Sequence, residues 1–409
     1  MIRALIGIIF VLVVAGSCRT PLDPVEPPAQ PVEQWSEPQW ETVPRSLAYD
    51  QLPGWDTADL EPGVQALRQS CDKIVSKNPN EFLSKRQLWG GRVSEWIPAC
   101  GALSVVGDQG SARAVLQALF TPIRVNPEGG NSRFTGYFEP TFQARLSPEG
   151  RFTDAVLPRP TDLVVRNGRV LQRRSDGSVS AYPKRAEIAR RADRGFAYMR
   201  PEDLFFLQIQ GSGRLLLPDG RTIRAVYAAN NGHTFVSTAN WLMRKGWITR
   251  SQASMAGIKA WMASTSEERL RAAMNANPRY IFFAQKPEGD PSLGPDGSQG
   301  VPLTPLGSIA VDPGFHPLGA PFFVKTSAPG LGGEWSSLVV AQDTGNAIKG
   351  AVRADIYFGT GDGAGQRADT MNAPGEMWIL LPRQVANRLS TASNAGHDQI
   401  DAGEILSLP

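Results

Sequence analysis

The sequence predicts an α+β protein that is mainly β with several helices. Three observations support this prediction: many turn-forming residues, helical patterns confined to two stretches, and short strand-like runs elsewhere. The 409 residues include 41 Gly and 33 Pro, well above the roughly 12% that these two residue types usually contribute. Such a composition favours turns and short strands over a helical bundle. With 41% hydrophobic residues the chain can bury a core, so wholesale disorder is excluded.

The N-terminus has the pattern of an export signal. Arg3 precedes an apolar run over residues 4–15, which is too short for a permanent membrane span but typical of a signal-peptide core. Small residues lead to Cys18 and Arg19 follows it, an arrangement that resembles the bacterial lipobox. We therefore expect residues 1–18 to form a lipoprotein signal peptide, with Cys18 lipidated on the periplasmic side of the outer membrane. An ordinary cleaved signal with an incidental cysteine is the alternative.

Residues 19–47 predict an extended tether. The segment carries repeated prolines, several glutamates and few aliphatic side chains, a composition typical of Pro-rich linkers. Such a tether would let a lipid-anchored body reach some distance from the membrane.

Residues 48–125 predict helices. Three apolar stripes recur at helical spacing, over residues 60–74, 93–103 and 115–120. Cys71 and Cys100 lie on the first two stripes, and an oxidising compartment permits a disulfide between them. Two separately buried thiols are the alternative.

Strand-like segments dominate from Phe134 to about residue 236. Residues 134–145 predict two strand pieces broken by Pro140. The apolar run 204–210 leads into a Gly-Ser-Gly turn, and we expect it to be a strand as well. Residues 221–227 predict a further strand ahead of an Asn-Gly turn.

Helices return between residues 236 and 277, and strands follow again from residue 301. The four residues from Ser264 to Glu267 have capping-box spacing, which predicts a helix start at Ser264. Short apolar runs after residue 301 are separated by glycine and proline, as expected for strands and turns.

Charge and cysteine usage exclude two classes of partner. The chain has 42 basic and 39 acidic residues, a net charge of +3, and no run of Lys or Arg. Electrostatic binding of nucleic acid needs a concentrated basic face, so we do not expect it. The three Cys and three His lack metal-ligand spacing, and no metal site is expected.

Three aspartates in the C-terminal third indicate a site. Asp312, Asp343 and Asp355 lie at the ends of short apolar runs or beside them, next to glycines. A single such aspartate is most often a turn-former that bonds its own backbone. Three in one small β region, flanked by Lys349 and Arg353, favour a functional cluster without naming a reaction.

This segment resembles the three-aspartate barrel of the MltA family of membrane-bound lytic murein transglycosylases. Its most specific signature is Asp-Thr-Gly-Asn-Ala-Ile-Lys-Gly at residues 343–350, followed by Asp-Ile-Tyr at 355–357. Supporting blocks appear in the family's order over about residues 130–385: Phe134-Thr135-Gly136-Tyr137, Gln210-Gly211-Ser212-Gly213, Asn231-Gly232-His233 and Asn277-Pro278.

The resemblance implies a double-psi β-barrel with an inserted second β domain and a groove between them for a glycan strand. The catalytic domain, with its helical N-terminal part, would comprise residues 48–138 and 287–409, and the insert residues 139–286. No metal or organic cofactor is implied. The implied partners are peptidoglycan glycan strands, the membrane through the lipid anchor, and proteins of cell-wall synthesis or remodelling.

The resemblance also implies a mechanism. Such enzymes cleave the β-1,4 bond between N-acetylmuramic acid and N-acetylglucosamine without water, because the muramic acid C6 hydroxyl attacks its own C1 and leaves a 1,6-anhydro end. Asp355 matches the catalytic residue and would act first as acid and then as base. Asp343 matches a supporting aspartate. Burial and repulsion by Asp343 would raise the pKa of Asp355, whereas Lys349 would oppose the rise.

Nine further residues are candidates for substrate binding, each with a structural alternative: Tyr137, Glu139, Gln210, Gly211, Ser212, His233, Asp312, Lys349 and Tyr357. Tyr137 would stack on a sugar or belong to the core. The block at 210–212 would bond acetamido groups or form a plain turn, and His233 would line the groove or have a structural role.

Two other functions remain open at this point. A hydrolytic peptidoglycan glycosidase needs a second carboxylate, for which Asp343 and Glu139 are the candidates. A non-catalytic peptidoglycan-binding lipoprotein would share the barrel and the groove but have no catalytic acid.

Overall fold

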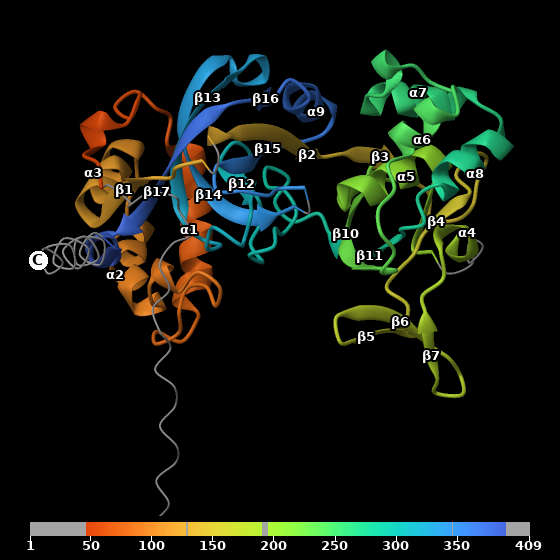
Figure 1. Ribbon diagram of the computed structural model, residues 1–409, viewed down its shortest axis with the longest axis horizontal. Coiled ribbons are helices and arrows are strands. Elements are labelled where there is room, and N and C mark those ends of the chain that lie inside the picture. Colours follow the sequence, from red (N-terminus) through yellow and green to blue (C-terminus); the bar gives the residue numbers. More distant parts are fainter. Residues whose placement is uncertain (1–45, 128–129, 190–194, 346, 390–409) are drawn as a thin grey trace, which may run out of the picture. The chain divides into compact units, whose positions relative to one another are not determined.

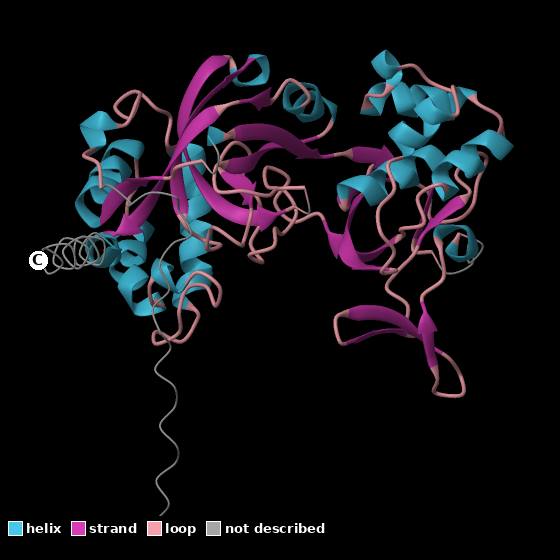
Figure 2. Cartoon of the chain, viewed as in Figure 1, coloured by secondary structure: helices cyan, strands magenta, loops and turns pink. Residues whose placement is uncertain are grey.

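The computed structural model describes residues 46–127, 130–189, 195–345 and 347–389. The predicted signal peptide, Cys18 and nearly all of the predicted tether lie outside these ranges, as does Asn346. Within them, no helix is both long and apolar enough to cross a membrane. Figures 1 and 2 show the helices and strands as they follow one another along the chain.

The predicted N-terminal helices are confirmed. They are α1 (Glu61–Val75), α2 (Val93–Ser104) and α3 (Gln109–Leu119). Two residues of the predicted stripes behave differently: Ile97 is exposed, and Phe120 begins a strand instead of ending a helix. A disulfide joins Cys71 of α1 to Cys100 of α2.

An eight-stranded sheet forms the core of the region that carries the three aspartates. In spatial order its strands are β1 (Phe120–Arg124), β17 (Gly375–Pro382), β13 (Pro321–Ala328), β14 (Gly333–Thr344), β12 (Ser308–Val311), β15 (Arg353–Thr360), β2 (Arg133–Glu139) and β16 (Asn372–Ala373). Neighbouring strands are antiparallel except for two parallel pairs, β12 with β14 and β15 with β2. Helix α9 (Asp362–Ala368) follows β15 directly and was not predicted.

Helix α1 packs closely on β14. A Cβ atom at Gly63 would lie only 2.1 Å from the carbonyl oxygen of Leu338, so only glycine permits this approach. The sheet curls so that strands far apart in its order approach each other: Thr326 of β13 donates a hydrogen bond to Pro374 O, beside β16, at 2.8 Å. Closure into the double-psi barrel remains a prediction.

Residues from β3 to β11 form the inserted region, with a sheet of its own. That sheet has the order β11 (Ile281–Pro287), β10 (Thr222–Asn230), β9 (Ser212–Leu216) and β3 (Thr141–Gln143). Two smaller sheets pair β4 (Asp154–Val156) with β8 (Ala197–Met199), and β5 (Leu163–Arg166) with β6 (Arg169–Arg173) and β7 (Val179–Ala181).

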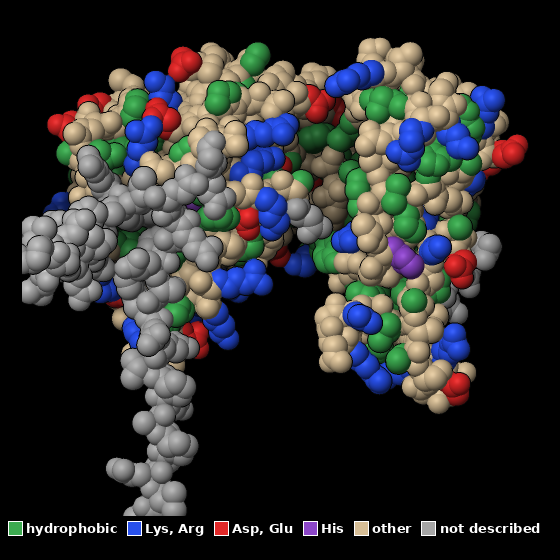
Figure 3. Space-filling view, viewed as in Figure 1, with side chains coloured by type: hydrophobic (Ala, Val, Ile, Leu, Met, Phe, Trp, Pro, Cys, Tyr) green, Lys and Arg blue, Asp and Glu red, His purple; other side chains and the backbone are tan. Residues whose placement is uncertain are grey.

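Helices gather beside the insert sheet (Figure 1). They are α4 (Arg185–Ile188), α5 (Pro201–Gln210), α6 (Thr238–Arg244), α7 (Met255–Ser264) and α8 (Glu267–Asn275). Short 3₁₀ turns occur along the chain at Tyr49–Gln51, Leu88–Gly90, Arg250–Gln252 and Pro329–Leu331. Basic side chains occur over both the eight-stranded sheet and the insert in the view of Figure 3 and do not gather in one stripe.

The strand predicted at residues 204–210 is wrong, because this run is helix α5. All residues from Pro201 to Gln208 are buried, so this part of the helix has no exposed polar face and shows no amphipathic period. The residues at its two ends, however, are typical of a helix start and a helix end. Proline occupies the first turn together with Glu202 and Asp203, and Gly211 ends the helix in the left-handed conformation, with φ of 84°.

The helices predicted between residues 236 and 277 are confirmed, but the predicted start at Ser264 is wrong. Ser264 is the last residue of α7. Helix α8 starts after Ser266, whose hydroxyl accepts a hydrogen bond from Arg269 N at 3.4 Å. The capping residue is therefore the serine two positions later.

Candidate active site

The sheet registers bring two of the three aspartates onto one face. Strand β12 lies between β14 and β15, and its Ala310 is paired with Asp343 on one side and with Asp355 on the other. Asp355 is paired in turn with Thr135 of β2. Paired residues on neighbouring strands point to the same face of a sheet. Thr135, Asp355, Ala310 and Asp343 thus form a line across four strands, which we call the aspartate row.

A β-bulge sets the direction of Asp343. Ile309 is paired with Ala341, but the next residue, Ala310, is paired with Asp343, so Gln342 is the extra residue. A bulge of this kind redirects the side chains that follow it. Without it, Gln342 would occupy the position in the aspartate row that Asp343 takes.

The side chain of Gln342 is fully buried and fastens the bulge to helix α1. Its Nε2 donates hydrogen bonds to Ala66 O at 2.7 Å and to Ser70 Oγ at 2.8 Å. Its Oε1 accepts a hydrogen bond from Ser308 at 2.5 Å. The helix that carries Cys71 therefore supports the strand that delivers Asp343.

Asp343 is held by three hydrogen bonds. Its Oδ1 accepts from the backbone N–H of Ser298 at 3.0 Å and from the Ser298 hydroxyl at 2.9 Å. Its Oδ2 accepts from the Tyr137 hydroxyl at 3.1 Å. These donors fix the carboxylate in one orientation and stabilise its negative charge.

Asp355 has a different environment. It accepts a hydrogen bond from the Thr135 hydroxyl at 2.7 Å, and Thr135 itself accepts one from Arg353 Nη2 at 2.9 Å. Burial raises the pKa of Asp355 above its usual value, and Asp343 contributes in the same direction, while Thr135 and Arg353 oppose the rise. A carboxyl group with a raised pKa is suited to donating a proton near neutral pH.

The opposing cation is therefore Arg353, and the expectation that it would be Lys349 is wrong. Lys349 Nζ lies 3.4 Å from Asp312 Oδ1. Asp312 also accepts hydrogen bonds from Gly314 N at 2.9 Å and Gly350 N at 3.1 Å. Although burial alone would raise the pKa of Asp312, these donors lower it. Asp312 lies outside the aspartate row and connects the turn after β12 to the turn before β15.

The two tyrosines occupy different depths. Tyr137 is half-buried and bonds Asp343, with its ring 5.3 Å from that of Tyr357. Burial, together with the nearby carboxylates of Asp343 and Asp355, raises the pKa of Tyr137, which keeps its hydroxyl a donor. Tyr357 is buried, and a Cβ atom at Gly294 would lie 2.4 Å from its hydroxyl. Tyr357 is thus packed behind the site, and its predicted contact with substrate does not agree with this placement.

Glu139 is likewise inaccessible, contrary to its predicted role in binding. Its side chain is fully buried and lies 3.0 Å from Arg214 Nε and 3.0 Å from Arg224 Nε. Burial raises the pKa of Glu139, and the two guanidinium groups oppose the rise. This ion-pair cluster joins β2 to strands β9 and β10 of the insert.

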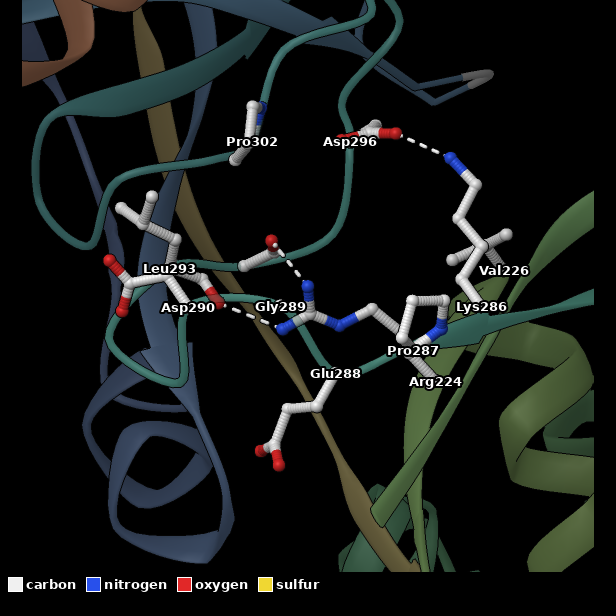
Figure 4. A pocket seen from close by; sticks show the side chains of 11 residues that line it. Arg224, Val226, Lys286, Pro287, Glu288, Gly289, Asp290, Leu293, Asp296 and Pro302 are labelled. Carbon is white, nitrogen blue, oxygen red and sulfur yellow. Dashed lines mark hydrogen bonds and ion pairs between the residues drawn. The ribbon is translucent and has the colours of Figure 1, made fainter.

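Backbone carbonyl groups also anchor one arginine of this cluster, Arg224. Arg224 donates hydrogen bonds to Leu293 O at 2.8 Å and to Gly294 O at 3.0 Å (Figure 4). A cavity of about 170 Å³ opens beside it, and its lining includes Lys286 and Asp296, which form an ion pair at 2.6 Å.

The remaining predicted residues lie in the insert and make no hydrogen bond to the aspartate row. Gln210 ends α5, Gly211 caps it and Ser212 begins β9. His233 bonds Tyr182 O through Nε2 at 2.8 Å.

Sequence reasoning missed the residues that orient the aspartates. Thr135 and Ser298 bond the aspartates directly, and Arg353 bonds Thr135. Gln342 acts through the bulge before Asp343, which it fastens to α1. Thr135 and Arg353 belong to segments that the sequence analysis named without these roles, whereas Ser298 lies in a loop without a pattern. Across the ranges that the structure describes, no group of three His, Cys, Asp or Glu side chains is arranged to hold a metal ion.

Comparison with known proteins assigns the family. The family profile of the MltA specific insert domain matches residues 133–284, and that of the 3D domain matches residues 307–381. The chain is 33% identical to membrane-bound lytic murein transglycosylase A of Escherichia coli K12 over 336 residues, which is 80% of this chain and 82% of that protein. The chain belongs to the MltA family.

Other MltA relatives agree with this assignment. The Vibrio cholerae transglycosylase A is 29% identical over 71% of this chain and 74% of its own length. Among solved structures, MltA from Neisseria gonorrhoeae is 29% identical, with a TM-score of 0.72 over 83% of this chain and 92% of that chain. A membrane-bound lytic murein transglycosylase from Agrobacterium tumefaciens is 28% identical, with a TM-score of 0.71 over 85% and 100%.

Proposed function

We propose that this MltA-family enzyme cleaves the β-1,4 bond between N-acetylmuramic acid and N-acetylglucosamine in peptidoglycan without water, with Asp355 as the single acid and base. The observation that carries the proposal is the aspartate row. It places one carboxyl group with a raised pKa beside a second carboxylate that is fixed by hydrogen bonds.

The first step is proton transfer to the leaving group. Asp355, protonated, gives its proton to the glycosidic oxygen, and the bond from C1 of muramic acid to that oxygen breaks. Positive charge develops on the sugar ring. The fixed carboxylate of Asp343 stabilises that charge, because its hydrogen bonds prevent it from turning away.

The second step closes the product. The C6 hydroxyl of the same muramic acid attacks C1, and its proton passes to the Asp355 carboxylate, which restores the starting state. The products are a 1,6-anhydromuramic acid end and an N-acetylglucosamine end with a free hydroxyl, so atoms balance without water. Because the nucleophile is part of the substrate, its effective concentration is very high.

The environments of the carboxylates disfavour hydrolysis. A hydrolase needs a second carboxylate that acts as nucleophile or that activates water. Glu139 is buried and paired with two arginines, and both oxygens of Asp343 accept hydrogen bonds already. A protein that only binds glycan needs no proton donor, so a purely binding role does not account for the raised pKa of Asp355.

The setting of the enzyme completes the proposal. Cys18 would carry the lipid anchor to the outer membrane, and residues 19–47 would tether the catalytic body. The glycan strand would lie in a groove between the region of the eight-stranded sheet and the insert. The corresponding biological role is turnover of the peptidoglycan wall, together with the proteins that synthesise or remodel it.

The deciding experiment is mass spectrometry of the fragments released from peptidoglycan sacculi by the purified full-length protein in detergent. Fragments ending in 1,6-anhydromuramic acid, one water lighter than hydrolytic products, are expected. Reducing ends would make the enzyme a hydrolase, and no release by folded protein would favour the binding function.

A further inference from the structure

A second cavity lies next to Asp343, away from the Glu139 cluster. It has a volume of about 280 Å³ and is lined by residues that include Lys77, Ser84, Arg86, Ser298 and Gln299. This volume is just below the roughly 300–1,000 Å³ of typical small-ligand sites. The cavity therefore has room for a small polar group or a short piece of peptide, and not for a long chain.

Ser298 connects this cavity to the aspartate row. It lines the cavity and also donates two hydrogen bonds to Asp343. Its neighbour Gln299 is fixed as well, because its N–H donates to Gln342 O at 2.9 Å and its Oε1 accepts from Ser70 at 2.8 Å. One wall of the cavity is thus held by the same contacts that orient Asp343.

The cavity carries unpaired positive charge. Its lining contains Lys77 and Arg86 and no Asp or Glu. None of the ion pairs that the structure describes includes either cation. Burial lowers the pKa of Lys77, Glu81 opposes the shift and Lys73 adds to it.

Unpaired cations at the mouth of a cavity favour an anionic ligand. A partly desolvated ammonium group that forms no ion pair gains free energy when an anion approaches. Neutral sugar rings cannot supply that charge. In peptidoglycan the lactyl group of muramic acid is amide-linked to the stem peptide, so the free carboxylates of a substituted strand belong to the peptide.

We propose that the cavity beside Ser298 binds a carboxylate of the stem peptide on a muramic acid residue positioned at Asp343. This inference rests on the proposed function, since it takes peptidoglycan as the substrate. Lys77 and Arg86 supply the charge. The Ser84 hydroxyl also lines the cavity and holds the Arg86 loop, because it accepts a hydrogen bond from Arg86 N at 3.2 Å. The enzyme accordingly prefers strands that carry peptide over strands without it.

The test is a binding measurement with two kinds of glycan strand. One kind carries stem peptides, and the other has been stripped by an amidase, which leaves only the lactyl carboxylate. The full chain with Asp355→Asn is used in detergent, so that the strands stay intact. The double variant Lys77→Gln/Arg86→Gln and the two single variants are compared with Lys85→Gln, which removes one positive charge next to Arg86 but outside the cavity lining.

We expect the double variant to bind peptide-bearing strands about tenfold more weakly, corresponding to roughly 1.4 kcal/mol, and stripped strands with unchanged affinity. Lys85→Gln should match the parent on both. Unchanged binding of peptide-bearing strands, or an equal loss on both kinds of strand, would overturn the inference.

Two features keep the result interpretable. Unchanged affinity for stripped strands shows that the double variant is folded, and if it does not fold, the single variants are expected to lose about threefold each. Product analysis with the unmutated enzyme tests the proposed function separately. If the enzyme binds as expected but releases no anhydro ends, the peptide-binding inference stands and the proposed reaction is wrong.

Discussion

Two carboxyl groups, Glu139 of β2 and Asp355 of the neighbouring strand β15, have opposite roles. Asp355 is paired with Thr135 near the start of β2, and Glu139 is its last residue. Burial raises the pKa of both. Glu139 lies between two guanidinium groups at 3.0 Å, whereas Asp355 accepts a hydrogen bond from one hydroxyl. Burial alone therefore does not make a carboxyl group reactive. The partners decide whether it binds the fold together or remains available to transfer a proton.

The largest effect is expected from Asp355→Asn. Asparagine keeps the size of the side chain but cannot transfer the proton, so release of anhydro-ended fragments should fall about 10²- to 10⁴-fold. Strand binding should persist. The matched control is Asp369→Asn, an exposed aspartate at the end of α9, which should leave the rate unchanged. Residual activity above one tenth would remove Asp355 from the mechanism.

The next effect concerns stability. Glu139→Gln leaves Arg224 buried without a counter-charge and Arg214 with only Glu288, and loss of one partner from a buried ion pair costs about 3–5 kcal/mol. Urea unfolding followed by fluorescence measures this cost. Glu288→Gln removes the partly exposed partner of Arg214 and should cost less than about 1 kcal/mol. Similar values for the two variants would contradict the structural role of Glu139.

A smaller effect on the rate is expected from Ser298→Ala. The substitution removes one of the three hydrogen bonds to Asp343 and leaves its carboxylate less firmly oriented. A loss of about tenfold in kcat/KM corresponds to one charge-assisted hydrogen bond, roughly 1.5 kcal/mol. The thermal midpoint should change little, because Ser298 is exposed. Ser292→Ala, in the same loop, is the control.

The smallest effect is a stability difference that depends on pH. The folded-state pKa of Asp355 is raised above its unfolded value, so ionisation disfavours the folded state, and stability is lost as pH rises through the folded pKa. Asp355→Asn should therefore be more stable than the unmutated protein at neutral pH, with the difference vanishing below the unfolded pKa. Thermal unfolding across this range tests the sign, and a less stable variant at neutral pH would contradict it.

The sequence predicted the positions of the aspartates but not their relation to one another. The short apolar runs before Asp312 and Asp343 are readable as strands, and both strands are present. The spatial order that places β12 between β14 and β15 comes from long-range pairing. No local sequence pattern indicates that Ala310 lies between Asp343 and Asp355 on the neighbouring strands.

Buried polar side chains account for the other misses. Gln342 and Glu139 are polar residues whose partners come from distant segments: α1 for the glutamine and the insert strands for the glutamate. A sequence shows which groups need partners when buried and cannot show where the partners lie. Helix α5 was missed for a related reason, since complete burial removes the polar face by which a helix is recognised.

The disulfide links the stability of the active site to oxidation of the protein. Cys71 follows Ser70, which binds the Gln342 bulge, so the covalent bond constrains the helix that supports Asp343. A bridge between residues 29 positions apart typically adds about 3–4 kcal/mol of stability, and thiols remain reduced in the cytoplasm. A newly made chain would thus reach full stability only after entering an oxidising compartment. Protein produced in a reducing cytoplasm would need oxidation before its activity is measured.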